Sequence, residues 1–194
     1  MSRFWSPAIQ SLVPYTPGEQ PKVDGLIKLN TNENPYPPAP GVEAVLRHFD
    51  SERLRLYPDP DCLALKQALA DTAGLARNQV FVGNGSDEVL ALTFMALLRQ
   101  PKPLLLPETS YSFYNVYIDL FGIDARHIPL TEDFRIDLDA YSGENGGIIF
   151  ANPNAPTSVS LDLNAIRALL ERNTDSVVVV DEAYVDFGAE SATR

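Results

Sequence analysis

Short runs of aliphatic residues alternate with longer stretches in which apolar positions recur every three or four residues, beginning near Asp61. The short runs are typical of buried strands, and the recurring pattern is typical of helices that bury one face. The pattern predicts helices over residues 62–73, 87–99, 111–121, 137–141 and 162–172. It predicts strands over residues 80–82, 104–106, 125–129, 148–150 and 177–180. Alternation with short loops predicts an α/β fold with a mostly parallel, doubly wound sheet.

Three of these helices follow a side chain that can accept a hydrogen bond from the free N–H groups of a first turn. These side chains are Asp61, Ser86 and Asp162, and we expect each of them to cap its helix. Gly74 is expected to end the first helix, because glycine readily adopts the left-handed conformation common at helix ends.

The first 40 residues follow a different pattern, because prolines interrupt them and each proline prevents a helix from running through. These prolines are Pro7, Pro14, Pro17, Pro21, Pro35, Pro37, Pro38 and Pro40. We expect residues 1–40 to form an N-terminal arm with one short strand at residues 26–29. Residues 41–194 are expected to form the domain that holds the sheet.

The last predicted strand ends in a pair of acidic residues. Four valines at positions 177–180 predict a strand buried on both faces, and Asp181 and Glu182 follow directly. Open α/β sheets bind ligands at the carboxyl ends of their strands. A carboxylate is costly to bury there without a partner, so we expect Asp181 to face a positively charged ligand atom. Glu182 points to the other side of the strand and is expected to be structural.

The composition excludes several classes of protein. The net charge of −11 argues against nucleic acid or an anionic membrane as a general partner. No run of eighteen apolar residues and no apolar leader near the start is present, so neither a membrane span nor a secretory signal is expected. The single cysteine, Cys62, fits a cytoplasmic protein. His48 and His127 have no partners at metal-ligand spacing, so no metal site is predicted.

The segment Gly83-Asn84-Gly85-Ser86-Asp87-Glu88 lies between a predicted strand and a predicted helix. Glycines let the backbone approach a ligand closely, and a helix N-terminus offers free N–H groups to a phosphate. Glu88 stands where the dinucleotide-binding fingerprint has its third glycine, so that fingerprint is absent. The segment predicts either a phosphate cradle or only a tight turn between strand and helix.

Two further strand ends carry side chains suited to a ligand. Tyr111 follows the strand at residues 104–106 and can stack on a flat ring, with core packing as the alternative. Tyrosines 114 and 117 and the phenylalanine at 121 recur at helical spacing and are assigned to the core. The loop at residues 151–158 can bond a ligand oxygen through an amide side chain, or it can form an Asx turn.

Together the strand ends offer a phosphate cradle, an aromatic face, an amide and a carboxylate. This set suits pyridoxal 5′-phosphate (PLP), which has a phosphate, a flat ring, a ring hydroxyl and a ring nitrogen. An aspartate beside the ring nitrogen favours its protonated form, because an opposite charge favours the charged state. The cationic ring can then act as an electron sink.

Five ordered motifs resemble those of the histidinol-phosphate aminotransferases, fold-type I enzymes of histidine biosynthesis. They lie at residues 29–36, 57–60, 83–88, 152–157 and 181–184. The resemblance implies a PLP-transferase-like large domain, with helices on both faces of a mostly parallel sheet, that follows an N-terminal arm. It also implies that a homodimer transfers an amino group between histidinol phosphate and 2-oxoglutarate.

The resemblance implies roles toward the cofactor. Ser86 and Asp87 would bind its phosphate through backbone N–H groups, and Tyr111 would stack on its ring. Asp181 would pair with the ring nitrogen and Tyr184 would bond to the ring oxygen. These last two would be the catalytic residues of this chain.

The resemblance also implies a second group of site residues. Tyr57 would reach the cofactor phosphate of the neighbouring subunit. Ala155 and Ser158 stand where the family often has asparagine and glycine, so we expect Asn154 to serve the ring oxygen instead. The residues near the substrate would be Tyr15, Asn30, Glu33 and Asn34.

The family's Schiff-base lysine follows the aspartate of the last motif, and no lysine of this chain does. The lysines are Lys22, Lys28, Lys66 and Lys102. We therefore expect the chain to be the first part of a longer protein and to be inactive by itself. The alternatives are another fold-type I enzyme, such as an amino-acid phosphate decarboxylase or an aromatic aminotransferase, and a non-catalytic phosphate-binding fragment.

Overall fold

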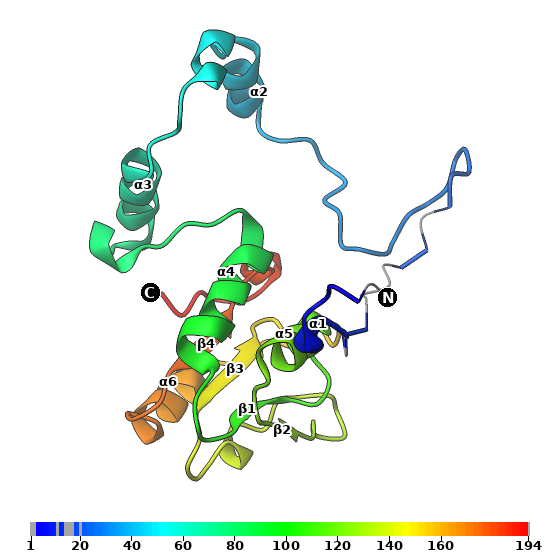
Figure 1. Ribbon diagram of the computed structural model, residues 1–194, viewed down its shortest axis with the longest axis vertical. Helices are drawn as coiled ribbons and strands as arrows, with labels where there is room; N and C mark the ends of the chain where they lie inside the picture. Colours follow the sequence, from blue (N-terminus) through cyan, green and yellow to red (C-terminus); the bar gives the residue numbers. More distant parts are fainter. Residues whose placement is uncertain (1–2, 11, 14–17, 20, 194) are drawn as a thin grey trace. The chain divides into compact units, whose positions relative to one another are not determined.

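The computed structural model describes all residues except 1–2, 11, 14–17, 20 and 194. The chain divides into two units, and Figure 1 labels the elements along it. One unit is Pro14–Leu65, and the other joins Met1–Val13 to Lys66–Arg194. The sheet belongs to the larger unit, and each unit is described by itself.

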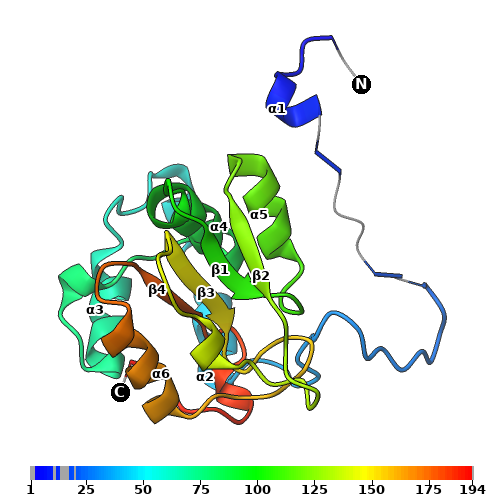
Figure 2. The ribbon, with the colours of Figure 1, turned by 90° about the horizontal axis from the view of Figure 1, so that it is seen from below.

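Four parallel strands form the sheet, in the order β2-β1-β3-β4 (Figure 2). They are β1 (Leu104–Pro107), β2 (Ala125–Ile128), β3 (Gly147–Ala151) and β4 (Val178–Asp181). The two central strands, β1 and β3, are fully buried, as expected for a parallel sheet covered on both faces. The predicted fold class is confirmed.

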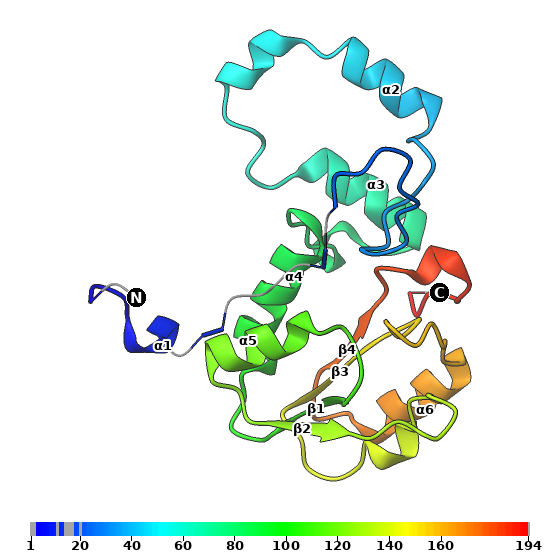
Figure 3. The same ribbon diagram turned by 90° about the vertical axis from the view of Figure 1, so that its right-hand side faces the viewer.

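Two helices cover one face of the sheet (Figures 2 and 3). They are α4 (Gly85–Thr93), which continues as a π-helical turn at Phe94–Leu98, and α5 (Phe113–Phe121). Leu104 and Leu106 of β1 enter this core together with side chains of both helices. Full burial of one such side chain contributes about 1.5–3 kcal/mol.

The third helix of the doubly wound arrangement, α6 (Leu163–Arg172), covers the other face (Figure 3). Leu105 of β1 packs there with Ile166 and Leu169 of α6. Because successive residues of a strand point to opposite faces, the three leucines of β1 divide between the two cores. Asp162 caps α6 as predicted, since its side chain accepts a hydrogen bond from the N–H of Asn164 at 2.8 Å.

The remaining elements of the described part of the chain are three α-helices and several 3-10 turns. They are the α-helices α1 (Pro7–Gln10), α2 (Pro40–Arg47) and α3 (Leu63–Ala73), and 3-10 turns at Ser51–Arg55, Arg77–Gln79, Leu138–Ala140 and Val185–Phe187. Gly74 follows α3 with a φ of +67°, as expected for a helix end. Among the described residues, no helix combines the length and the apolar character needed to cross a bilayer.

Two predicted helix caps are wrong. The N–H of Leu63 at the start of α3 donates to the carboxylate of Asp59 at 2.8 Å, so Asp59 takes the place expected for Asp61. Ser86 lies inside the first turn of α4, which begins at Gly85. Glu88 reaches back to accept a hydrogen bond from the backbone N–H of Asn84, and the side chain of Asn84, the N-cap residue, caps no N–H group of the first turn.

Three strand predictions also need correction. Residues 26–29 and 80–82 form no strand, although the backbone of Val80 is extended, because an extended segment becomes a strand only beside a hydrogen-bonding partner. Strand β4 is half-buried rather than buried on both faces. Within the described sheet it pairs with β3, and its residues pack against both cores, Val179 against one and Val178 and Val180 against the other.

Candidate active site

The loops after β1, β3 and β4 meet at the end of the sheet where the strands have their carboxyl termini, because parallel strands all end on the same side. Hydrogen bonds join these loops. The Ser110 hydroxyl donates to Asn154 Oδ1 at 2.8 Å, and Asn154 Nδ2 donates to the carbonyl oxygen of Thr109 at 3.0 Å. The backbone N–H of Asn152 donates to the carbonyl oxygen of Asp181 at 2.8 Å. Side chains from three separate strand ends are therefore held in one connected site.

Asp181 is the last residue of β4, and two donors hold its carboxylate. The Tyr114 hydroxyl donates to Oδ2 at 2.6 Å, and the backbone N–H of Ala183 donates to Oδ1 at 3.0 Å. A carboxylate has about four lone-pair sites, so these contacts leave acceptor capacity for a ligand. The geometry suits a ligand atom that is cationic and carries a hydrogen.

Tyr114 belongs to the first turn of α5 and is fully buried. Burial, reinforced by the negative charge of Asp181, raises the pKa of the Tyr114 hydroxyl well above its ordinary value. The phenol therefore remains protonated, and it always acts as the donor toward Asp181.

Glu182, next to Asp181, has different partners. Its Oε2 accepts from the Ser191 hydroxyl and its Oε1 from the N–H of Ala192, both at 2.6 Å. Both contacts belong to the local fold, and the structural role of Glu182 stays a prediction. Tyr184 lies on the same strand-end loop, directly before the turn Val185–Phe187.

The N-terminus of α4 presents backbone N–H groups. Gly85 has a φ of +79°, a conformation that costs glycine little and other residues more. Ser86 and Asp87 follow in the exposed first turn, where helical N–H groups have no intrahelical partner. This turn can therefore bind an anion such as a phosphate.

Two tyrosines connect this turn to α5. The Tyr111 hydroxyl donates to Asp87 Oδ1 at 3.1 Å, and the Tyr117 hydroxyl donates to the Asp87 carbonyl oxygen at 2.8 Å. The Tyr111 ring meets the Tyr114 ring edge to face, with centroids 5.5 Å apart. The aromatic side chain expected to stack on a ring thus lies beside the turn expected to bind a phosphate. Burial, with a contribution from Asp87, raises the pKa of Tyr117 to about 12.

Asn154 is buried, and the two nearby strand-end loops already use its side chain. Its Nδ2 donates to Thr157 Oγ1 at 3.2 Å in addition to the Thr109 carbonyl. The contact of Asn154 with a cofactor stays a prediction, and the structure shows it joining the loops. Asn152 is also buried, and its Nδ2 has no hydrogen-bond partner among the described residues.

The sequence pattern assigns Tyr114 and Tyr117 to the core, where both lie, but it misses their hydrogen bonds to the site. Tyrosines recur every third residue at positions 111, 114 and 117, on one side of α5 and the turn before it. A buried tyrosine hydroxyl usually requires a hydrogen-bond partner. The presence of tyrosine rather than phenylalanine at these positions therefore indicated that their hydroxyls bond to another part of the fold.

The predicted substrate residues lie in the smaller unit, and Tyr15 is outside the described residues. Asn30 Nδ2 donates to the carbonyl oxygen of Glu19 at 2.9 Å. Glu33 pairs with Lys28 at 2.5 Å, and this hydrogen bond and charge lower the pKa of the Glu33 carboxyl. These contacts belong to the fold of the segment, and the substrate roles stay predictions.

Two other predicted residues share that unit. Asn34 Oδ1 accepts a hydrogen bond from the N–H of Tyr36 at 3.0 Å, which forms a local turn. The side chain of Tyr57 is fully exposed, so its hydroxyl is available to a molecule outside the chain. Its contact with a neighbouring subunit stays a prediction.

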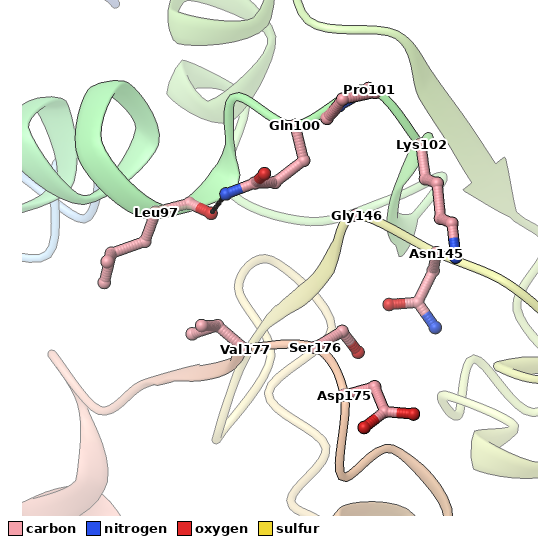
Figure 4. A pocket seen from close by; sticks show the side chains of 9 residues that line it. All are labelled: Leu97, Gln100, Pro101, Lys102, Asn145, Gly146, Asp175, Ser176 and Val177. Atoms are coloured by element: carbon pink, nitrogen blue, oxygen red, sulfur yellow. Dashed lines mark hydrogen bonds between the residues drawn. The ribbon is translucent and has the colours of Figure 1, made fainter.

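A cavity of about 320 Å³ lies at the opposite end of the sheet, beside the amino termini of its strands (Figure 4). Segments that precede β1, β3 and β4 line it, including Lys102, Asn145 and Asp175. Lys102 pairs with Glu144 at 3.4 Å. Open α/β sheets bind ligands at the carboxyl edge, and no predicted site residue lines this cavity. In the described part of the chain, no group of three His, Cys, Asp or Glu side chains could hold a metal ion.

Comparisons with known proteins show the family to which the chain belongs. Residues 24–194 match the family model of aminotransferases of class I and II. A histidinol-phosphate aminotransferase of Chromohalobacter salexigens is 64% identical over 192 residues, which cover 99% of this chain and 54% of that protein. Histidinol-phosphate aminotransferase 1 of Hydrogenovibrio crunogenus is 59% identical over 194 residues, 100% of this chain and 54% of that protein. The chain spans about half the length of these curated relatives.

A solved structure shows the same fold. Histidinol-phosphate aminotransferase from Sinorhizobium meliloti, in complex with pyridoxal-5′-phosphate, has a TM-score of 0.83 and 24% sequence identity. The match covers 99% of this chain and 54% of that chain.

Proposed function

Because the chain belongs to the family of class I and II aminotransferases, we propose that the whole protein is a PLP-dependent histidinol-phosphate aminotransferase. It transfers an amino group between histidinol phosphate and 2-oxoglutarate in histidine biosynthesis. Relatives that carry this name are 57–64% identical to the chain. The structural observation that supports the proposal is the carboxylate of Asp181, held at the end of β4 and connected through Tyr114 and Tyr117 of α5 to the first turn of α4.

The side chains of the site fit the chemistry of PLP. The first turn of α4 offers the N–H groups of Ser86 and Asp87 to the phosphate, and Tyr111 offers an aromatic face to the ring. The Asp181 carboxylate holds a proton on the ring nitrogen, because an opposite charge favours the charged form. When bound, PLP supplies an electron sink that no protein side chain provides.

The remaining roles complete the proposal. Tyr184 bonds to the ring oxygen, with Asn154 in support, and Tyr57 reaches the phosphate site of the neighbouring subunit in a homodimer. The enzyme acts in the cytoplasm, where Cys62 stays a free thiol. The substrate is bound near Tyr15, Asn30, Glu33 and Asn34.

A pair of variants of the full-length protein tests the role of Asp181. Asp181→Asn keeps the shape of the side chain and removes its charge, so the ring nitrogen loses the partner that keeps it protonated. We expect the loss of this partner to lower the pKa of the ring nitrogen by about two units, which corresponds to a rate loss on the order of a hundredfold. Glu182→Gln is the matched control, because among the described residues the side chain of this neighbouring acid bonds to Ser191 and Ala192 and to no other group. Transamination of histidinol phosphate by Asp181→Asn at the wild-type rate would refute the assignment.

The rival functions give different results with the same preparation. The proposal requires saturable PLP binding by the full-length protein and glutamate formation that depends on histidinol phosphate. Binding of NAD in place of PLP would indicate the non-catalytic phosphate-binding alternative. Release of carbon dioxide from an O-phosphorylated amino acid, without transamination of histidinol phosphate, would indicate the decarboxylase.

A further inference from the structure

The bond between Tyr114 and Asp181 connects the core of the larger unit to its candidate active site. Tyr114 is 0% exposed, and its hydroxyl lies 2.6 Å from Asp181 Oδ2. The two residues are 67 positions apart and come from different elements, α5 and β4. No motif of the chain joins them, so only the fold brings them together.

We propose that Tyr114 is a positioning residue, whose hydroxyl holds the Asp181 carboxylate in the orientation that pairs with the cofactor's protonated ring nitrogen. The inference rests on the proposed function, since it concerns the same site. It assigns a role to a residue that contacts neither cofactor nor substrate and acts only through Asp181.

The packing around Tyr114 makes it a rigid support. Its ring lies 5.9 Å from the Phe94 ring and 5.5 Å from the Tyr111 ring, measured between centroids. Phe94 is itself 0% exposed, so the tyrosine cannot turn without disturbing a close-packed core. The χ2 torsion of an aspartate side chain without partners takes a broad range of values, and a hydrogen bond from a fixed donor restricts this range.

The chemistry of the donor also suits this role. Tyr114 is neutral, so it orients the carboxylate without cancelling its charge. A lysine or arginine in the same place would compete with the ring nitrogen for Asp181. None of the ion pairs in the described part of the chain includes Asp181. The second donor, the N–H of Ala183, is neutral as well and holds the other oxygen.

The test compares two cofactors on the full-length protein stripped of cofactor. One is PLP, and the other is its analogue with carbon in place of the ring nitrogen. Dissociation constants are measured by absorbance titration for the wild type and for Tyr114→Phe. We expect the wild type to bind PLP more tightly than the analogue. In Tyr114→Phe the ratio of the two dissociation constants should fall about tenfold, which corresponds to the contribution of one hydrogen bond to a charged group. Affinity for the analogue should stay unchanged, because it has no nitrogen to meet Asp181.

Tyr141→Phe serves as the matched control. It also removes one buried hydroxyl, but from the opposite core and without loss of a hydrogen bond among the described residues. It should keep the wild-type preference. If Tyr114→Phe weakens both cofactors equally or neither, the positioning role is overturned while the proposed function stands. If the wild type binds neither cofactor, the proposed function itself fails.

Discussion

Two buried tyrosines allow a matched measurement of what one hydrogen bond contributes to the stability of this fold. Tyr114 and Tyr141 lie in the cores on opposite faces of the sheet and are 0% and 1% exposed. Replacing either one by phenylalanine removes a single oxygen and retains the ring. Tyr114→Phe breaks the bond to Asp181, whereas Tyr141→Phe breaks none that the described residues make.

The expected magnitudes follow from the state of each hydroxyl. A hydrogen bond to a charged group contributes about 1.5–3 kcal/mol, and the lower part of that range applies because Asp181 is only half-buried and water can replace part of the bond. Tyr114→Phe should therefore lower the free energy of unfolding by about 1.5–2 kcal/mol. A buried hydroxyl without a partner is itself costly, so Tyr141→Phe should change that free energy little or raise it by up to about 1 kcal/mol.

Urea unfolding of the cofactor-free, full-length protein, followed by circular dichroism, measures both variants. With a slope of about 2 kcal/mol per molar urea, the two midpoints should differ by roughly 1 M. Equal midpoints, or a lower midpoint for Tyr141→Phe, would refute the reasoning, because the hydrogen bond would then not decide the outcome.

Three smaller predictions follow from local structure. Asp162→Ala should lower the stability by about 1 kcal/mol, since it removes the cap of α6, and Asp162→Ser should recover most of the loss. Gly122→Ala should cost about 1 kcal/mol from backbone conformation alone, because Gly122 ends α5 at a φ of +61° and an added Cβ would meet no atom within 4 Å. Both changes are measurable as shifts of the thermal midpoint. The folded state keeps Tyr117 neutral, since its pKa rises from 10.0 to about 12. The resulting stability is present below pH 10 and is lost as pH rises toward 12, and Tyr117→Phe should flatten this loss in a stability profile.

The secondary-structure pattern predicted the parallel sheet correctly, together with the helices that cover its two faces. The run Leu104 to Leu106 and the cap at Asp162 are local signals, because the residues that indicate the strand or helix lie within it or directly beside it in the sequence. The residues at 80–82 show the limit of such signals. Their composition suits a strand, but a strand also needs a neighbour, and the neighbour is not part of the local pattern.

The sequence by itself determined which residue types stand at the strand ends, and those types already indicated a flat, phosphorylated and cationic ligand. Only the tertiary structure decided the strand order β2-β1-β3-β4 and that Asp181 is held by Tyr114, 67 residues away. Periodicity reports the face on which a side chain lies. A hydrogen bond between distant residues depends instead on how helices and strands pack together, so no local pattern can predict it.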